Sequence, residues 1–443
     1  MQQVNAPPAA ALDRPFHIIV VLWGELFRNY FLNYCLPSLL SPGNIPALAT
    51  RQKSKLVLAT RPEDWEAMQA TPIFRLAERY VQPVFIEIPP CPKDKSGCEH
   101  MGIGHKLACE MAYREKAYAA VLTPDFMMAD GAFARLQQLA QSGVELVLAA
   151  ALRFGEEPLF AHLRANGALP REDQIGNGEP LTISCRDLTR AAINSFHSHS
   201  ASCEWGSPIY PHVPHAAWWR VPNEDGVLLY SLSWAPLLID YAGFTRHDTT
   251  TMDQWTIDGD YLYKNLEHIG RIHLVQDSDE LFLCSWAPLA DREVGQLPIL
   301  RFRPLGILAW CQQFKLHFES PIFDPLKRKL FFKPVRWHAR PLNKAWDAAE
   351  SSAMRRLLSL VDSPNLDPKI VSDPRTKMGR FAFRQVNAVV SRPLPRMLLH
   401  LPLRAYRFTT DLVHGRVTRE RVQKLIARNL NAVLGRAHEE PSP

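Results

Sequence analysis

The sequence predicts an α/β protein built on a mixed, mainly parallel sheet that helices cover on both faces. Three observations support this fold class. Short apolar runs rich in Val, Ile and Leu recur from Phe16 onward, and helical patterns separate them. The chain has 443 residues, of which 47% are hydrophobic, so it can bury a large core.

The first part of the chain alternates strands and helices in the order expected of a doubly wound sheet. The predicted strands are residues 17–22, 55–59, 84–88, 119–122 and 145–149. Predicted helices lie near 30–40, 62–70, 73–80, 103–116 and 130–142. A helix near 182–196 and strands at 226–230, 236–240 and 271–275 continue the pattern, so residues 16–150 and 151–300 are interpreted as two halves of one domain.

The remaining segments differ in composition. Residues 1–15 are rich in Pro and Ala and are expected to be a flexible N-terminus. Residues 301–443 hold 27 Lys and Arg against 11 Asp and Glu, whereas residues 1–300 hold 24 against 34. This basic C-terminal region, predicted to be mainly helical with helices at 354–361 and 416–434, is suited to bind phosphates of an anionic membrane or a nucleic acid. A solvated helical face is the plain alternative.

The sequence favours a cytoplasmic location. The N-terminus lacks a basic start followed by an apolar run, and no run of 18 apolar residues occurs. The eight cysteines are scattered, which is typical of reduced side chains. With the basic C-terminal region, this predicts a cytoplasmic protein that can sit at the inner membrane face.

Ligand-binding residues are expected where the strands end, because open α/β sheets bind ligands beyond the carboxyl ends of their strands. These positions hold Trp23-Gly24, Thr60-Arg61, the segment Gly102 to Lys106, and Thr123-Pro124-Asp125. Gly102-Ile103-Gly104 is interpreted as a helix start, where free N–H groups, His105 and Lys106 would favour a phosphate. The chain contains no Gly-x-Gly-x-x-Gly after its first strand, no P-loop and no Gly-x-Ser-x-Gly elbow.

The segment from His105 to Asp130 resembles the part of GT-A-fold glycosyltransferases that leads into their Asp-x-Asp motif. The resemblance implies that residues 16–150 bind a nucleotide-sugar and that residues 151–300 carry the acceptor and catalytic groups. It assigns nucleotide contacts to Trp23, Gly24, Thr60, Arg61, His105, Lys106 and Asp125. Asp125 would be the first acid of a site for Mn²⁺ or Mg²⁺. The second acid is replaced by Met127, and a helix N-cap explains the next one, Asp130.

Other acids and several histidines are candidates for chemistry in residues 151–300. Asp258 and Asp260 flank a Gly before a predicted helix, where the resemblance implies a catalytic acid, although helix capping also explains them. Asp277 and Asp279 follow a strand and could supply the missing metal oxygens. His197, His199 and Trp218 are predicted to contact the acceptor, with the aromatic ring against a sugar; a purely structural role is the alternative.

These observations lead to the hypothesis of a glycosyltransferase that moves a sugar from a nucleoside diphosphate to a glycan or lipid-linked acceptor. Two other hypotheses stay open. A nucleic-acid-associated protein would bind through the basic C-terminal region. A catalytically inactive scaffold would explain Met127.

Overall fold

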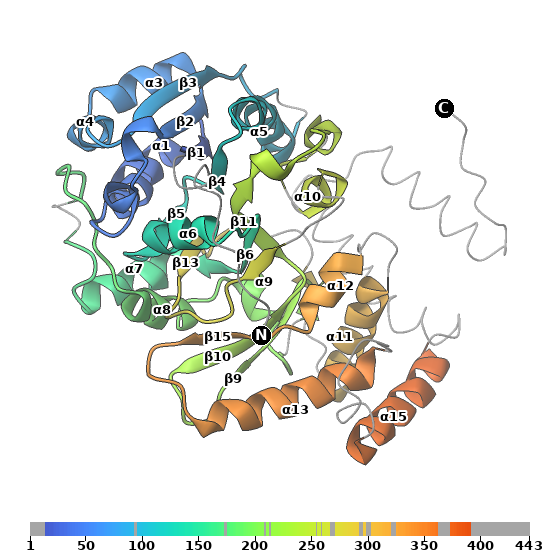
Figure 1. The fold of residues 1–443 in the computed structure, drawn as a ribbon. Helices are drawn as coiled ribbons and strands as arrows, with labels where there is room; N and C mark the ends of the chain where they lie inside the picture. The colour runs from blue at the N-terminus through green and yellow to red at the C-terminus, as the bar shows by residue number, and fades with distance from the viewer. Residues whose placement is uncertain are drawn as a thin grey trace, which may run out of the picture.

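The computed structural model describes residues 14–390, except 93–94, 172–174, 208–209, 212–213, 254, 258, 266–270, 292–295, 298–302, 320–324 and 362–372. These residues form an α/β protein whose main sheet has seven strands (Figure 1). Across this sheet the strands follow in the order β12 (Ile272–Leu274), β6 (Leu146–Ala150), β11 (Trp234–Asp240), β4 (Tyr118–Leu122), β1 (Phe16–Val21), β2 (Lys55–Thr60) and β3 (Gln82–Glu87).

The main sheet is parallel apart from β11, which is antiparallel to both of its neighbours. The chain forms β1, β2 and β3 in sequence and then crosses to the other side of β1, where it forms β4. The carboxyl ends of β1 and β4 therefore lie side by side at the point where the strand order reverses. In sheets of this kind that position opens a crevice for ligands.

Side chains on both faces of the sheet are buried, as expected of a parallel sheet between two helical layers. Ile19 and Val57 face a cluster that includes residues of α5 (Gly97–Arg114). Ile18 and Leu58 face the opposite cluster, which α2 (Leu36–Leu39), α4 (Pro72–Glu78) and α6 (Ala132–Gln141) complete. The strand pattern of the sequence thus defines both halves of the core.

The other helices of this part connect the strands. They are α1 (Glu25–Tyr30), which continues through a π-helical turn at Phe31–Cys35, α3 (Pro62–Gln69), α7 (Glu156–Ala165), α8 (Cys185–Ile193), α9 (Ser198–Ala201) and α10 (Gly259–Asn265). Short 3-10 turns lie at Ile45–Ala47, Arg51–Lys53, Tyr241–Gly243 and Thr250–Asp253. All eight predicted strands are confirmed to within two residues at each end.

Three smaller sheets join segments that are distant in sequence. One contains β5 (Phe126–Met128), β13 (Leu283–Ala287) and β7 (Arg153–Gly155), and another contains β15 (Val335–His338), β10 (Gly226–Ser231) and β9 (Ala216–Arg220). The third pairs β14 (Gln296–Leu297) with β8 (Tyr210–Pro211). Because β15 pairs with β10, the segment after residue 301 shares a sheet with the segment before it.

The C-terminal region is helical where the structure describes it. Its helices are α11 (Arg303–Phe318), α12 (Pro325–Phe331), α13 (Lys344–Leu360) and α15 (Pro374–Val390). Figure 1 shows α13 running along the sheet of β9, β10 and β15, with α15 beside its end. The predicted helix at 354–361 is the end of α13, and the one at 416–434 lies outside the described residues. No helix among the described residues is long and apolar enough to span a bilayer.

Candidate functional site

The turn after β1 brings an aromatic ring and an unusual backbone to the carboxyl edge of the sheet. Trp23 is half-buried, and its ring meets His100 of α5 edge to face at 4.9 Å. Gly24 has φ +81°, a conformation that L side chains rarely adopt, and an added Cβ would meet no atom within 4 Å. Glycine is therefore required here for its backbone conformation and not for space.

Asp64 of α3 holds this turn in place. Its buried carboxylate accepts hydrogen bonds from the backbone N–H of Gly24 at 2.8 Å, from Arg28 at 2.7 Å and from Arg61 at 3.0 and 3.1 Å. Burial alone would raise the pKa of Asp64, but the hydrogen bonds from Gly24 and Arg61 outweigh it and hold the pKa below its ordinary value. The sequence prediction did not include Asp64, although its carboxylate accepts all of these hydrogen bonds.

The two predicted residues at the end of β2 differ in their surroundings. Thr60 is fully buried, and its hydroxyl has no hydrogen-bond partner in the described part of the chain. Arg61 pairs with Asp64 and also lies 3.2 Å from Glu63. Arg61 is therefore engaged in fixing the turn, whereas the Thr60 hydroxyl is a buried polar group without a partner.

The prediction of a helix start at Gly102 is wrong. Helix α5 begins at Gly97, after Ser96, whose hydroxyl accepts from the Glu99 N–H while the Glu99 carboxylate accepts from the Ser96 N–H. This capping box stands in the sequence as Ser-x-x-Glu. Gly102 instead lies inside the helix, where an added Cβ would come within 2.1 Å of the Met252 carbonyl oxygen.

His105 and Lys106 consequently do not lie at a helix N-terminus. His105 is buried, its Nδ1 lies 2.8 Å from the Thr256 hydroxyl, and burial lowers its pKa to about 4, so the ring is neutral near pH 7. Lys106 forms an ion pair with Asp253 at 2.7 Å. Neither side chain adds positive charge to the first turn of α5, which corrects the basis of the predicted phosphate site.

Asp125 occupies the position where the strand order reverses. It follows β4 directly, is partly buried, and has a pKa raised by burial, while the charge of Arg153 lowers it. Met127 occupies the position where the resemblance implies a second acid. It lies in β5 with its side chain fully buried in the core. The turn therefore offers one carboxylate, and β5 buries the residue two positions later.

Tyr30, Glu156 and Arg153 accompany Asp125, and none of them was predicted from the sequence. The buried Tyr30 hydroxyl at the end of α1 donates a hydrogen bond to the Glu156 carboxylate at the start of α7. Burial raises the pKa of Glu156, the Tyr30 hydrogen bond lowers it, and the charges of Asp291 and Asp125 raise it further. These groups therefore lie within electrostatic reach of one another.

Arg153 connects this acidic group to helix α5. Burial raises the pKa of Asp125 and that of Cys98, in the first turn of α5, and the charge of Arg153 opposes this rise at both groups. The positive side chain is thus within electrostatic reach of both an acid at the reversal point and a helix N-terminus, where backbone N–H groups also favour anions. The signal in the sequence was Arg-Phe-Gly-Glu-Glu-Pro after the fifth predicted strand, a typical helix start with early acids.

The predicted acceptor-binding residues are mostly structural. Trp218 is 1% exposed, stacks on Phe196 at 4.3 Å and donates its indole N–H to the Ser200 carbonyl. His197 is fully buried and caps α9. The His199 ring stacks on another ring, that of His215, at 4.4 Å. Trp218 therefore serves the core and does not present its ring to a sugar, which corrects that prediction.

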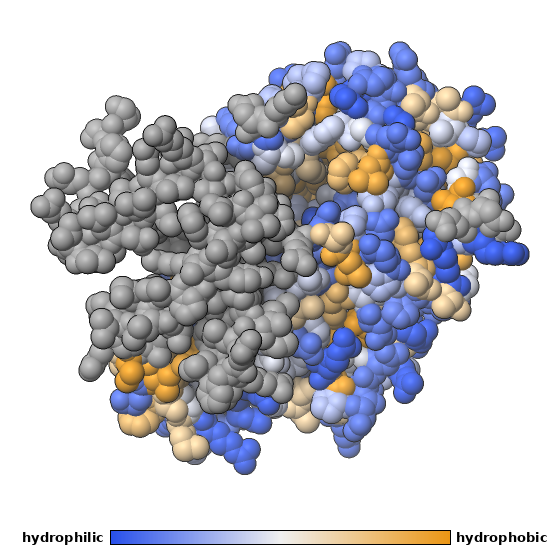
Figure 2. Space-filling view, turned by 180° about the vertical axis from the view of Figure 1, so that it is seen from behind, coloured by the Kyte–Doolittle hydropathy of each residue, from blue (hydrophilic) through white to orange (hydrophobic). Residues whose placement is uncertain are grey.

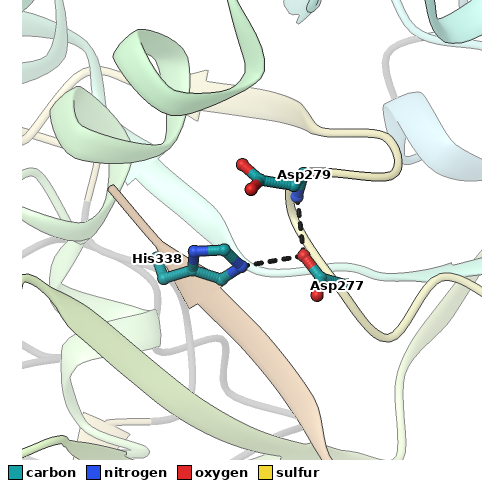
Figure 3. Close-up of side chains that lie close together, drawn as sticks. All are labelled: Asp277, Asp279 and His338. Carbon is teal, nitrogen blue, oxygen red and sulfur yellow. Dashed lines mark hydrogen bonds and ion pairs between the residues drawn. The ribbon is translucent and has the colours of Figure 1, made fainter. Parts of the chain in front are cut away.

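Asp277 and Asp279 are joined by a residue from the C-terminal region. Their carboxylates and the ring of His338 each offer a ligand atom within 4.8 Å of the others, so the group could hold a metal ion. Figure 3 shows the ring of His338, on β15, pointing at Asp277, with Nε2 2.8 Å from the carboxylate. His338 Nδ1 lies 2.7 Å from the Arg340 carbonyl oxygen, which can only accept.

This hydrogen-bond pattern favours a protonated His338. Burial lowers its pKa, but the hydrogen bonds to Asp277 and to the Arg340 carbonyl outweigh it and raise the pKa above the ordinary value. A metal ion needs a ring nitrogen without a proton, so it would have to displace the proton on Nε2. Arg186 also binds Asp279 at 2.8 Å. As arranged here, the group is an ion-pair network.

The structure describes the side chain of neither predicted catalytic acid. Asp258 lies outside the described residues, and Asp260 falls in α10 but its side chain is not described. Both therefore stay predictions. Comparison with known proteins finds no family model that matches the chain and no curated protein that matches its sequence.

Proposed function

We propose that the chain is a glycosyltransferase with a GT-A-like fold that binds a nucleoside diphosphate sugar at the carboxyl ends of β1 and β4. The observation that carries this proposal is the position of Asp125 at the point where the strand order reverses, beside β5, which β13 pairs with the strand that begins at Arg153 and leads into Glu156. The mixed, mainly parallel sheet, in which β11 is antiparallel, is the kind of sheet that the resemblance implies.

The donor is proposed to lie along the turn after β1. Trp23 offers an aromatic surface for the base, and Gly24 allows close approach of the backbone. Arg153 and the N–H groups of the first α5 turn supply positive potential for the diphosphate. This proposal places the phosphates at the start of α5. That position is about one and a half turns before Gly102, where the sequence predicted the helix start.

Glu156 is proposed as the general base that activates the acceptor. Its carboxylate would take the proton of an acceptor hydroxyl while that oxygen forms a bond to the anomeric carbon. The bond between the anomeric carbon and the phosphate oxygen breaks, and the nucleoside diphosphate leaves with the electron pair. Raised pKa values of Glu156 and Asp125 are typical of functional acids near a reaction centre.

The residues at the reversal point do not fit a resident divalent cation, because among the described residues Asp125 and the acids near it do not bring three ligand atoms within 4.8 Å of one another, as Asp277, Asp279 and His338 do. The Asp277 group is delivered by a strand that β6 and β11 separate from β4. No step of the proposed reaction therefore passes through a metal. Titration of the nucleotide with and without Mn²⁺ tests directly whether the site uses a divalent cation.

The test is calorimetric titration of the full chain with UDP and GDP, with and without Mn²⁺, followed by release of nucleoside diphosphate from a panel of sugar nucleotides. We expect one nucleotide to bind, and Glu156→Gln, which removes the proposed general base, to reduce turnover by about a hundredfold or more. Glu66→Gln, an exposed carboxylate on α3, is the matched control and should behave as the unmodified chain. Binding of neither nucleotide would contradict the proposal.

A further inference from the structure

Helix α15 is fixed to the protein by one face. Thr376 is buried, Gly379 approaches Ser359 of α13 so closely that an added Cβ would come within 2.9 Å of its Cβ, and Arg380 donates to the Leu358 carbonyl at 2.7 Å. Phe383 packs on the core of the C-terminal region. These positions recur every three or four residues, so they form one side of the helix.

The opposite face of α15 is apolar and exposed. Met378 is 71% exposed, Phe381 65%, Val386 38% and Val389 57%. At about 100° per residue, Met378, Phe381 and Val389 project to one side of the helix, away from the buried face, and Val386 lies at the edge of this stripe. Figure 2 shows apolar surface at the lower left, the corner that α15 occupies after the half-turn from Figure 1. A stripe of this kind on a single exposed helix marks an interaction surface.

Positive charge borders the apolar stripe. Arg375, Lys377 and Arg384 are exposed on α15, and the helix contains no acidic residue. The sequence continues in the same way, because no Asp or Glu occurs between Asp373 and Asp411. The partner of this surface must therefore accept apolar side chains and carry negative charge.

We propose that α15 docks on the surface of an anionic lipid bilayer. The apolar stripe would enter the boundary between headgroups and acyl chains, and the basic side chains would lie among the lipid phosphates. A nucleic acid would use the charge but offers no apolar layer for Met378 and Phe381. This inference does not rest on the proposed glycosyl transfer, although a lipid-linked acceptor would bring the two together.

The experiment is sedimentation of the full chain with vesicles of phosphatidylcholine alone or with about 30% phosphatidylglycerol, whose anionic headgroups attract basic segments. We expect binding to the anionic vesicles that weakens with salt, and little binding to the neutral ones. Met378→Ser/Phe381→Ser should weaken binding by about tenfold or more, because two large apolar side chains no longer leave water. Leu26→Ser changes a leucine that is also exposed, on α1 at the far end of the molecule, and should have no effect.

A second variant tests the surface without risk to folding. Gln385→Leu fills a polar gap on the exposed side of α15 and should strengthen vesicle binding. Three results would overturn the proposal: equal binding to neutral and anionic vesicles, unchanged binding by both α15 variants, or a self-association, seen by light scattering, that Met378→Ser/Phe381→Ser abolishes. Binding to an oligonucleotide but not to vesicles would assign the basic region to nucleic acid instead. Titration of the same variants with UDP and GDP shows whether nucleotide binding is retained. Failure of the membrane proposal can therefore be told apart from failure of the proposed function.

Discussion

At the scale of single residues, Glu156 shows how its neighbours tune one carboxylate. Burial and the negative charges of Glu157, Asp291 and Asp125 favour the protonated form, whereas the Tyr30 hydroxyl stabilises the charged form. A general base must be deprotonated to act, so the rate should fall on the acid side as Glu156 takes up its proton. The Tyr30 hydrogen bond extends activity toward lower pH.

Tyr30→Phe should shift the acid limb of the profile of kcat/KM against pH upward by about one unit, because the Glu156 carboxylate loses a hydrogen bond and its pKa rises. The profile is measured as nucleoside diphosphate release. Tyr113→Phe on α5 is the control and should leave the limb in place. An unmoved limb in Tyr30→Phe would remove Glu156 from the role of base.

Asp64 is a second residue whose environment dictates its charge state. Asp64→Asn should lower the free energy of unfolding by about 2 kcal/mol at pH 7, because the donors of Arg61 and Gly24 lose a charged acceptor. Thermal or urea unfolding measures this. Glu63→Gln, which changes an exposed carboxylate on the same turn of α3, should have a much smaller effect.

The pH dependence of this effect has a definite sign. Asp64 has a lowered pKa in the folded protein, so its contribution is present above the ordinary pKa of 3.8 and is lost as pH falls through the folded value. The difference between the unmodified chain and Asp64→Asn should therefore shrink on acidification below about pH 4. A difference that does not depend on pH would show that the charge of Asp64 contributes nothing.

At the scale of elements, α5 is positioned by glycines inside the helix. Gly102 lies against the carbonyl oxygens of Met252 and Trp255, and Gly104 lies against Val21 and Ala59 of the sheet. Glycine weakens a helix intrinsically, so its benefit here is close packing. The same packing brings His105 to Thr256.

Gly102→Ala should destabilise the protein and displace the turn at Thr250–Asp253, since an added Cβ overlaps two backbone carbonyl oxygens. We expect a loss of about 1–3 kcal/mol in unfolding free energy. Gly97→Ala is the matched control on the same helix, because its Cβ would meet only Trp23 at 4.0 Å. Equal stability of the two variants would contradict this account.

At the scale of the whole molecule, His338 and Asp277 join β15 to the loop after β12, and so join the smaller sheet to the main one. The backbone continues the connection, because Ser278 donates its N–H to the Arg336 carbonyl and Arg336 donates to the Gln276 carbonyl. The C-terminal segment is thus part of the same hydrogen-bonded structure as the sheet that carries the site.

His338→Gln should lower stability by about 1 kcal/mol at pH 6 and by less at pH 9. His338 has a raised pKa in the folded protein, so its contribution is present below the ordinary value of 6.5 and is lost as pH rises through the folded value. Unfolding curves at the two pH values measure the difference. A larger loss at pH 9 would indicate that the neutral ring is the stabilising form.

Much of the fold could be predicted from the sequence because its strands are continuous apolar runs. Burial on both faces leaves such runs few alternatives, so β1, β2, β4 and the position of Asp125 after β4 follow from local pattern. The start of α5 could also have been found, since its capping box is local, but three glycines within the helix concealed it.

The sequence by itself determined the α/β class, the strands of the main sheet and an acid at a strand end, because each depends on residues that are neighbours along the chain. Only the tertiary structure decided which groups accompany Asp125. Tyr30, Arg153 and Glu156 lie on separate elements, and the pairing of β5, β13 and β7 positions the segments around them. Three-residue strands of this kind are stabilised by long-range pairing and burial and leave almost no local pattern.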